Sequence, residues 1–386
     1  MTQVQNTDAP ALLLMVAGAK GAIGTTLALA TTAMRDNNSA IINGLTTRDK
    51  FPFMGDVHKI QMVGWDSGTL SMAQAAQHHA VVPESLRSTY TAAIEDMDVR
   101  PAPAMHLPVA DQVKHISHDM RHFINQYPQA HPVFVSLLPA AQNIDQVRPL
   151  DSLDAILRLP SIELPDMGYA LAALTMGIPI VNFTPNTIEF PVICQEALTR
   201  QVPLAGRDGK TGQTYFKVVL ASALKARALY VDGWYSLNIL GNEDGKNLMD
   251  PERACGKLDN KTNLLDDILE YKVGERYKTP THKVHIDYYP PRGDAKEAWD
   301  VIDLQGIFGL PMSLRLNLQA RDSILAAPLA IDMARWTAAL KRAGIGGPIA
   351  DLGFFFKKPV GNTPPITFQE QLTALERLEK QIADRI

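Results

Sequence analysis

The chain has 386 residues, enough for two domains or one large domain with an insert, and the 46% of hydrophobic residues supports a full-sized core. Its formal net charge of −4 and isoelectric point of about 6.2 exclude a protein that attracts nucleic acid or membrane surfaces by a global positive charge. Cys194 and Cys255 can form no disulfide framework and lack metal-ligand spacing, and the polar first ten residues do not resemble a signal peptide. We therefore expect a cytoplasmic protein with no dedicated metal site.

The first half of the chain alternates between strand and helix patterns. Residues 11–17 form a continuous apolar run that ends at Gly18, which is typical of a buried parallel strand, and residues 22–34 predict the helix that follows. Later segments repeat this alternation: strands at 60–65, 133–138 and 178–183, and a helix at 166–176. The pattern predicts an α/β fold with a Rossmann-type, doubly wound parallel sheet.

The pattern changes after about residue 215. Residues 283–289 and 313–318 alternate between apolar and polar side chains, which predicts a sheet with one covered face and one wetter face. The wetter face could meet solvent, another subunit or the substrate. We expect residues 215–323 to form an inserted α+β domain for catalysis and oligomerisation.

A long apolar helix is predicted from about residue 323 to residue 342. A capping-box pattern at Thr367 and Glu370 then predicts a C-terminal amphipathic helix that packs back on the first domain. Residues 1–214 and 324–386 would therefore make one discontinuous Rossmann domain.

A glycine-rich turn lies between the first predicted strand and helix. Glycines there let backbone N–H groups approach a pyrophosphate, which the helix N-terminus attracts. The alternative is a tight turn without a ligand. The candidate residues for dinucleotide binding are Gly18, Ala19, Lys20, Gly21, Ala22, Ile23 and Gly24.

Polar residues at later strand ends are further candidates for the cofactor crevice. Asp66 could accept hydrogen bonds from a ribose hydroxyl, or it could serve only as a cap or turn residue. Ser136 and Asn186 follow or end later strands, and either could simply satisfy local backbone groups.

Residues 241–248 combine amides, acids and a lysine between glycines, and Lys257 and Lys261 follow four residues apart. On a helix these two lysines share a face, where an anion between them would relieve their repulsion. The alternative is a lysine pair exposed to solvent. For Lys296 and Lys357 the alternative is an ordinary surface charge. Asp322 offers a carboxylate that could bind a lysine, and residues 211–214 offer a hydroxyl-rich helix start that could bind a phosphate. Either segment could instead act only as a helix cap.

Several of these segments together resemble the inositol-3-phosphate synthase (myo-inositol-1-phosphate synthase) family. The resemblance covers most of the chain from about residue 11 and is strongest from 208 to 330. The matching motifs are Gly64-Trp65-Asp66, Thr211-Gly212-Gln213-Thr214, the run 240–248 followed by Lys257 and Lys261, Gly293-Asp294-Ala295-Lys296, the run 322–329, and Phe356-Lys357-Lys358-Pro359. In the glycine loop this chain has Ala22 and Ile23 where the family usually carries two asparagines.

The resemblance implies a homotetrameric enzyme that binds NAD and converts glucose 6-phosphate to 1D-myo-inositol 3-phosphate by oxidation, enolisation, aldol closure and reduction. It assigns catalysis to Lys257, Lys261, Lys296, Lys357, Asp294, Asp322, Asn238 and Asp244. It assigns the substrate to Thr211, Gly212, Gln213, Thr214, Leu240 and Asn242, and places Asp208 near the cofactor.

Other functions stay open at this point. A cyclase of the same family could act on a different hexose phosphate. An NAD-dependent polyol or hydroxy-acid dehydrogenase would share the glycine loop but would accumulate NADH. A non-catalytic NAD-sensing protein would have no need of the clustered lysines. The pair His78-His79 is expected on a solvated helix face rather than at a metal.

Overall fold

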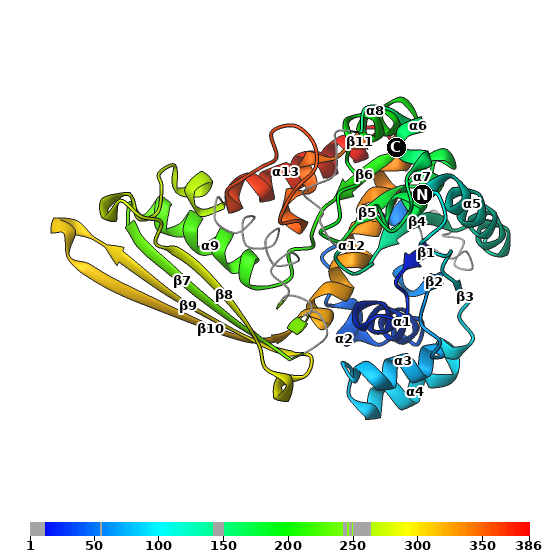
Figure 1. Cartoon of the computed structure of the whole chain (residues 1–386), viewed down its shortest axis with the longest axis horizontal. Helices are drawn as coiled ribbons and strands as arrows, with labels where there is room; N and C mark the ends of the chain where they lie inside the picture. The colour runs from blue at the N-terminus through cyan, green and yellow to red at the C-terminus, as the bar shows by residue number, and fades with distance from the viewer. Residues whose placement is uncertain (1–11, 55, 142–149, 242–244, 247–248, 250–263) are drawn as a thin grey trace, which may run out of the picture.

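The structure, a computed structural model, describes residues 12–54, 56–141, 150–241, 245–246, 249 and 264–386. A seven-stranded sheet lies at one end of the molecule, and a four-stranded sheet extends away from it at the other end (Figure 1). Helix α12 (Asp322–Arg342) follows the last strand of the smaller sheet and runs into the layers of the larger one. None of the described helices is both long and apolar enough to cross a lipid bilayer.

The larger sheet is parallel throughout and has the order β11-β6-β5-β4-β1-β2-β3. Strand β1 pairs with β2 on one side and β4 on the other, so successive crossovers leave it in opposite directions. Such a switch point opens a crevice outside the carboxyl ends of the strands. This confirms the predicted fold class. The strands are β1 (Leu12–Ala17), β2 (Ile60–Asp66), β3 (Val99–Pro101), β4 (His131–Ser136), β5 (Ile180–Asn182), β6 (Pro203–Gly206) and β11 (Gly347–Pro348).

Helices cover both faces of the larger sheet, which explains why β1 is apolar at every position. Leu12 and Leu14 pack into a core shared with α1 (Ala22–Arg35) and α12. Leu13 and Met15 pack into a second core with α5 (Val109–Gln126) and α7 (Met167–Thr175). The remaining helices here are α2 (Ser39–Ile42), α3 (Met72–His79), α4 (Glu84–Glu95), α6 (Leu153–Arg158) and α8 (Pro191–Thr199), with short 3-10 turns at η1 (Pro52–Met54) and η2 (Val57–Lys59).

The C-terminal helix α13 (Phe368–Ala383) returns to this part of the molecule, as predicted. It begins with the expected capping box, in which the Thr367 side chain accepts a hydrogen bond from Glu370 N. Its residues Leu378 and Ile382 join the core that contains Leu12. The helix packs on η7 (Ala350–Phe355), the turn that ends two residues before Lys357.

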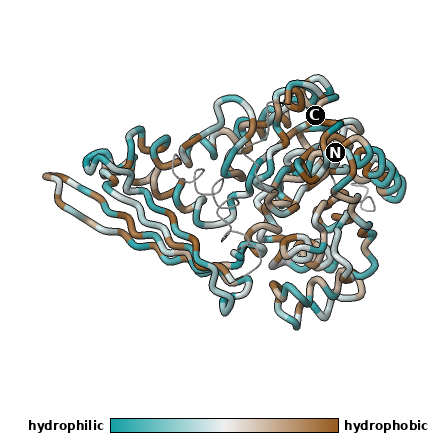
Figure 2. Tube along the Cα trace, viewed as in Figure 1, coloured by the Kyte–Doolittle hydropathy of each residue, from teal (hydrophilic) through white to brown (hydrophobic). Residues whose placement is uncertain are grey.

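The smaller sheet has the order β10-β9-β7-β8, with β7 (Tyr230–Leu240) parallel to β8 (His282–Tyr288) and antiparallel to β9 (Ala295–Gln305). Strand β10 (Pro311–Arg321) forms a long hairpin with β9. Apolar and polar residues alternate along β8 and β10 (Figure 2). Short 3-10 turns lie at η4 (Glu275–Tyr277), η5 (Pro290–Arg292) and η6 (Ile307–Gly309).

One face of the smaller sheet is covered and the other is open, as the alternation predicted. Helix α9 (Gln213–Ala226) packs its Val218 and Leu224 against Trp234 and Ile302 in a third core. Trp299 belongs to the same sheet and is exposed. The domain boundaries expected near residues 214 and 323 lie close to the first residues of α9 and α12.

Candidate active site

The glycine loop joins β1 to α1 at the centre of the parallel sheet. Gly18 has a φ of +84°, and a Cβ there would lie 2.8 Å from Leu137 O, so glycine is required. A Cβ on Gly24 would lie 2.4 Å from Ala19 O. Helix α1 has neither a side-chain cap at Gly21 nor an acidic residue in its first turn. Its N-terminal amides can therefore face an anion.

Asp66 ends β2 and ties the glycine loop to the next loop. Its Oδ2 accepts a hydrogen bond from Lys20 N at 2.8 Å, and its Oδ1 accepts one from Gly68 N at 2.7 Å. The role as a turn residue, one of the two alternatives from the sequence, is thus seen directly. A contact with a ribose hydroxyl stays compatible, because each carboxylate oxygen can accept a second hydrogen bond.

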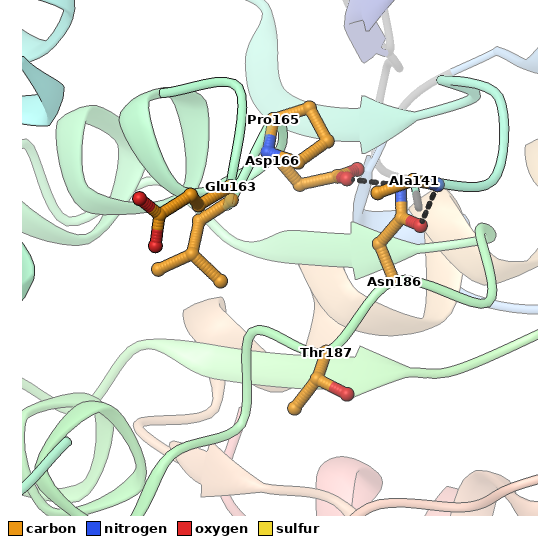
Figure 3. Close-up of a pocket in the computed structure, with 7 residues that line it drawn as sticks. Ala141, Glu163, Pro165, Asp166, Asn186 and Thr187 are labelled. Atoms are coloured by element: carbon orange, nitrogen blue, oxygen red, sulfur yellow. Dashed lines mark hydrogen bonds between the residues drawn. The ribbon is translucent and has the colours of Figure 1, made fainter. Parts of the chain in front are cut away.

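Ser136 and Asn186, both predicted cofactor residues, meet on the carboxylate of Asp166. Ser136 Oγ donates to Asp166 Oδ1, and Asn186 Nδ2 donates to Oδ2 at 2.5 Å (Figure 3). The Oδ1 of Asn186 in turn accepts from Ala141 N at 2.8 Å. A small pocket at the carboxyl edge of β4 and β5 is lined by Ala141, Asp166 and Asn186, together with Glu163, Leu164, Pro165 and Thr187.

Asp166 is a site residue that sequence reasoning missed, because it was expected only to begin a helix. Its burial raises the pKa of its carboxyl group to about 6, although hydrogen bonds from Ser136, Asn186 and Thr184 oppose that rise. Its partners lie in two other segments, at Ser136 and at Thr184 and Asn186, so spacing along the chain gave no signal of the contact.

Lys357 reaches the site through a short antiparallel pairing between residues 207–210 and 355–358. Lys357 N donates to Asp208 O at 2.7 Å, and Lys210 N donates to Phe355 O at 2.8 Å. The pairing sets the side chain of Lys357 beside that of Asp208, where Nζ lies 2.7 Å from Oδ1. As expected from the sequence, an apolar helical turn, η7, ends just before the lysine.

Asp322 gathers three predicted site residues from distant segments. Its Oδ2 lies 3.2 Å from Lys296 Nζ, and its Oδ1 accepts a hydrogen bond from Thr211 Oγ1 at 3.1 Å. Burial opposes the charged form, but the ammonium groups of Lys296 and Lys357 outweigh it and hold the pKa of the Asp322 carboxyl below its usual range. The N-cap of α12 is Arg321, so Asp322 is used for these contacts and does not cap the helix.

The predicted phosphate-binding run lies at the start of α9. Gly212 is the N-cap, and no side chain caps the helix. The side-chain amide of Gln213 instead donates to the buried carboxylate of Asp300, at 2.9 Å from Oδ2. The backbone N–H of Gln213, with that of Thr214, is therefore the part of this run that can meet a phosphate.

Asn238 lies on β7 with 1% of its surface exposed. Among the described residues, neither its Oδ1 nor its Nδ2 has a hydrogen-bond partner. A buried polar group left unpaired costs about 1–3 kcal/mol, so an orphaned amide marks a place where a ligand group fits. Leu240 ends the same strand, and Asp294 lies near the start of α12, where it accepts a weak hydrogen bond from Ser323 Oγ at 3.4 Å. The predicted residues Asn242, Asp244, Lys257 and Lys261 lie outside the described residues.

Comparison with known proteins identifies the family. The family profile described as Myo-inositol-1-phosphate synthase matches residues 212–323. Inositol-3-phosphate synthase 1 of Bacteroides thetaiotaomicron is 33% identical over 384 residues, which cover 90% of this chain and 89% of the relative. The chain belongs to the inositol-3-phosphate synthase family. This confirms the resemblance seen in its motifs and the expectation of an enzyme.

Two relatives from animals are longer than this chain. The Bos taurus protein is 29% identical over 78% of this chain, and the match spans 60% of the bovine sequence. The solved structure of the Caenorhabditis elegans synthase superposes with a TM-score of 0.84 at 21% identity, covering 98% of this chain and 87% of that one. A related Thermotoga maritima structure gives a TM-score of 0.71 at 18% identity, covering 96% and 98%. These two structural matches establish the shared fold.

Proposed function

We propose that this enzyme uses NAD to convert glucose 6-phosphate to 1D-myo-inositol 3-phosphate. The observation that carries the proposal is the meeting of charges at Asp322. Lys296 binds this carboxylate, and Lys357 lies close enough to act on its pKa. Preorganised cations suit a reaction that builds negative charge on substrate oxygens.

The cofactor proposal rests on the fit of the crevice residues. The glycine loop and the uncapped start of α1 would hold the pyrophosphate, and Asp66 would accept a ribose hydroxyl. Asp208, Ser136 and Asn186 would lie nearer the nicotinamide, at the edge of β4, β5 and β6. Bound NAD would supply reversible hydride acceptance at C5 of the sugar, with no net redox change.

Oxidation of C5 to a ketone makes the C6 protons acidic. Loss of one of these protons to a base gives an enolate, whose C6 can attack the C1 aldehyde to close the ring. The enolate and the ring alkoxide both carry negative oxygen. We assign Lys357 Nζ to these oxygens and to proton transfer, with Lys257 as its predicted partner. Lys296 and the predicted Lys261 would hold the phosphate and the C5 oxygen. Asp208 and Asp322 would orient the two described ammonium groups through their ion pairs.

The homotetramer is also a proposal, supported by the open face of the smaller sheet. Trp299 on this sheet is 48% exposed, and the β9–β10 turn carries Ile307 and Phe308 at 79% and 89% exposure. Exposed apolar groups on one continuous sheet are typical of an interface between copies of a chain. We also expect the enzyme to act in the cytoplasm.

The test is incubation with glucose 6-phosphate and substoichiometric NAD, with the product identified by NMR. We expect inositol phosphate in excess of the NAD supplied and no net NADH. Stoichiometric NADH would instead identify a dehydrogenase. A panel of other hexose phosphates decides the substrate, and closure of a different sugar alone would overturn the assignment to glucose 6-phosphate.

A further inference from the structure

Lys210 is a buried lysine next to the proposed site that the mechanism above does not use. Only 4% of its surface is exposed. Its Nζ donates to Gln371 Oε1 at 2.9 Å and to Gly353 O at 3.1 Å, and lies 6.0 Å from the centre of the Phe354 ring. It forms no ion pair within the part of the chain that the structure describes.

The two acceptors belong to separate segments near the C-terminus. Gln371 is in the first turn of α13, where its Nε2 donates to Pro365 O at 3.3 Å and Ile366 O at 3.1 Å. Gly353 is in η7, four residues before Lys357. One ammonium group thus joins α13, η7 and the loop that carries residues 208–211.

The neighbours of Lys210 in the chain contact residues of the proposed site. The residue two before it, Asp208, pairs with Lys357, and the residue after it, Thr211, bonds to Asp322. Movement of Lys210 relative to η7 would therefore change the distance between Asp208 and Lys357. Thr211 has its own anchor in Asp322, so the phosphate-binding run depends less on Lys210.

A buried ammonium that meets only neutral acceptors is unfavourable for stability. Its burial lowers the pKa of Lys210 to about 7. A methionine would fill the same space without that cost, but it could not make two directed hydrogen bonds. The contribution of the lysine is therefore geometric.

We propose that Lys210 is a positioning residue that fixes η7 to the β6–α9 loop and thereby holds Lys357 in its reactive place. The inference rests on the proposed cyclisation for its kinetic readout. Because Lys357 is assigned to the oxyanion, while the phosphate is assigned to Lys296 and to the backbone at the start of α9, loss of Lys210 should lower kcat and leave KM nearly unchanged.

The test compares Lys210→Met with Lys341→Met, measuring cyclisation kinetics and amide hydrogen exchange over residues 353–360. Lys341 is a suitable control because its Nζ also donates to a backbone carbonyl, Gln201 O at 3.0 Å, but at the far end of α12. We expect Lys210→Met to lower kcat about tenfold or more, since small misplacements of catalytic groups have such effects, with KM within about threefold. Exchange in residues 353–360 should become faster, and Lys341→Met should change neither quantity.

Unchanged kcat, or unchanged exchange, in Lys210→Met would overturn the inference, and so would a change confined to KM. If Lys210→Met does not fold, Gln371→Leu removes one acceptor and keeps the lysine, and the same two results are expected. A wild-type protein that forms no inositol phosphate would instead overturn the proposed function. In that case the exchange measurement alone decides whether Lys210 fixes η7.

Discussion

The buried side-chain amide of Asn238 indicates where a polar group of a ligand would bind. Its amide lies on β7, buried and without a partner among the described residues. The sequence identified this asparagine only through the family motif. Its burial and its missing partners depend on β8 and β9 lying on either side of β7, which no local pattern specifies.

Replacement of Asn238 by leucine separates function from stability. Because Asn238 loses no hydrogen bond to any described residue, Asn238→Leu should leave the free energy of unfolding unchanged or raised while turnover falls about tenfold or more. Asn182→Leu is the matched control, since Asn182 is also buried but donates to Asn186 O at 2.7 Å. The control should lose about 1–3 kcal/mol in urea unfolding. Equal destabilisation of the two variants would show that Asn238 is an ordinary structural amide.

Asp166 predicts a pH dependence of stability. Its pKa is about 6 in the folded chain against an ordinary value of 3.8, so the folded state binds the proton more tightly than the unfolded state. The resulting stabilisation is complete below the ordinary pKa and is lost as the pH rises through about 6. The difference corresponds to about 3 kcal/mol. In Asp166→Asn this contribution is absent, so the unfolding free energies of the two proteins should diverge between these pH values. Parallel pH profiles would contradict the raised pKa.

The strands and helices differ in how much of them could be predicted. The β1 strand and its glycine loop were clear, because an apolar run that ends at a glycine is typical of a buried strand followed by a tight turn. Strands β7 and β9 were not recognised as full-length strands. Both carry buried polar residues, such as Ser236 and Asp300, that interrupt the expected alternation, and β7 has a register shift between Val231 and Gly233. Ser236 Oγ donates to Asp300 Oδ1 across the sheet, a contact that only the strand pairing reveals.

The glycine loop gives a prediction for dinucleotide binding. A Cβ on Gly24 would lie 2.4 Å from Ala19 O, so Gly24→Ala must displace the loop, and NAD affinity should fall about tenfold or more. Gly346→Ala introduces a similar clash, 2.3 Å from Gln201 C, but far from the loop. Calorimetric titration with NAD should show weakened binding only for Gly24→Ala. Equal affinity in the two variants would remove the loop from the cofactor site.

At the scale of the whole molecule, the smaller sheet leaves large apolar side chains exposed among the described residues, such as Trp299. In the part of the chain that the structure describes, Ile307 and Phe308 in the β9–β10 turn are the most exposed large apolar side chains. The sequence predicted the open face but left three uses for it. The periodicity of the sequence shows that one face of the sheet is polar. It does not show whether solvent, another subunit or the substrate lies against that face.

Assembly through this face predicts a response to charge. Phe308→Glu should shift the protein from tetramers to smaller species in sedimentation velocity, because a carboxylate would be buried at the contact. Ile162→Glu is the control, since Ile162 is 65% exposed but lies among the helices around the larger sheet. A wild-type protein that sediments as a monomer, or equal dissociation by the two variants, would contradict the proposed interface.

The most direct measurement of the central claim follows the hydrogen at C5. Glucose 6-phosphate labelled with deuterium at C5 is converted in the presence of unlabelled NAD, and the inositol phosphate is analysed by NMR and mass spectrometry. If the same site oxidises, cyclises and reduces the sugar, the deuterium returns to its original carbon and the NAD pool stays unlabelled. Deuterium that accumulates in NADH, or a product that has lost the label, would contradict the account.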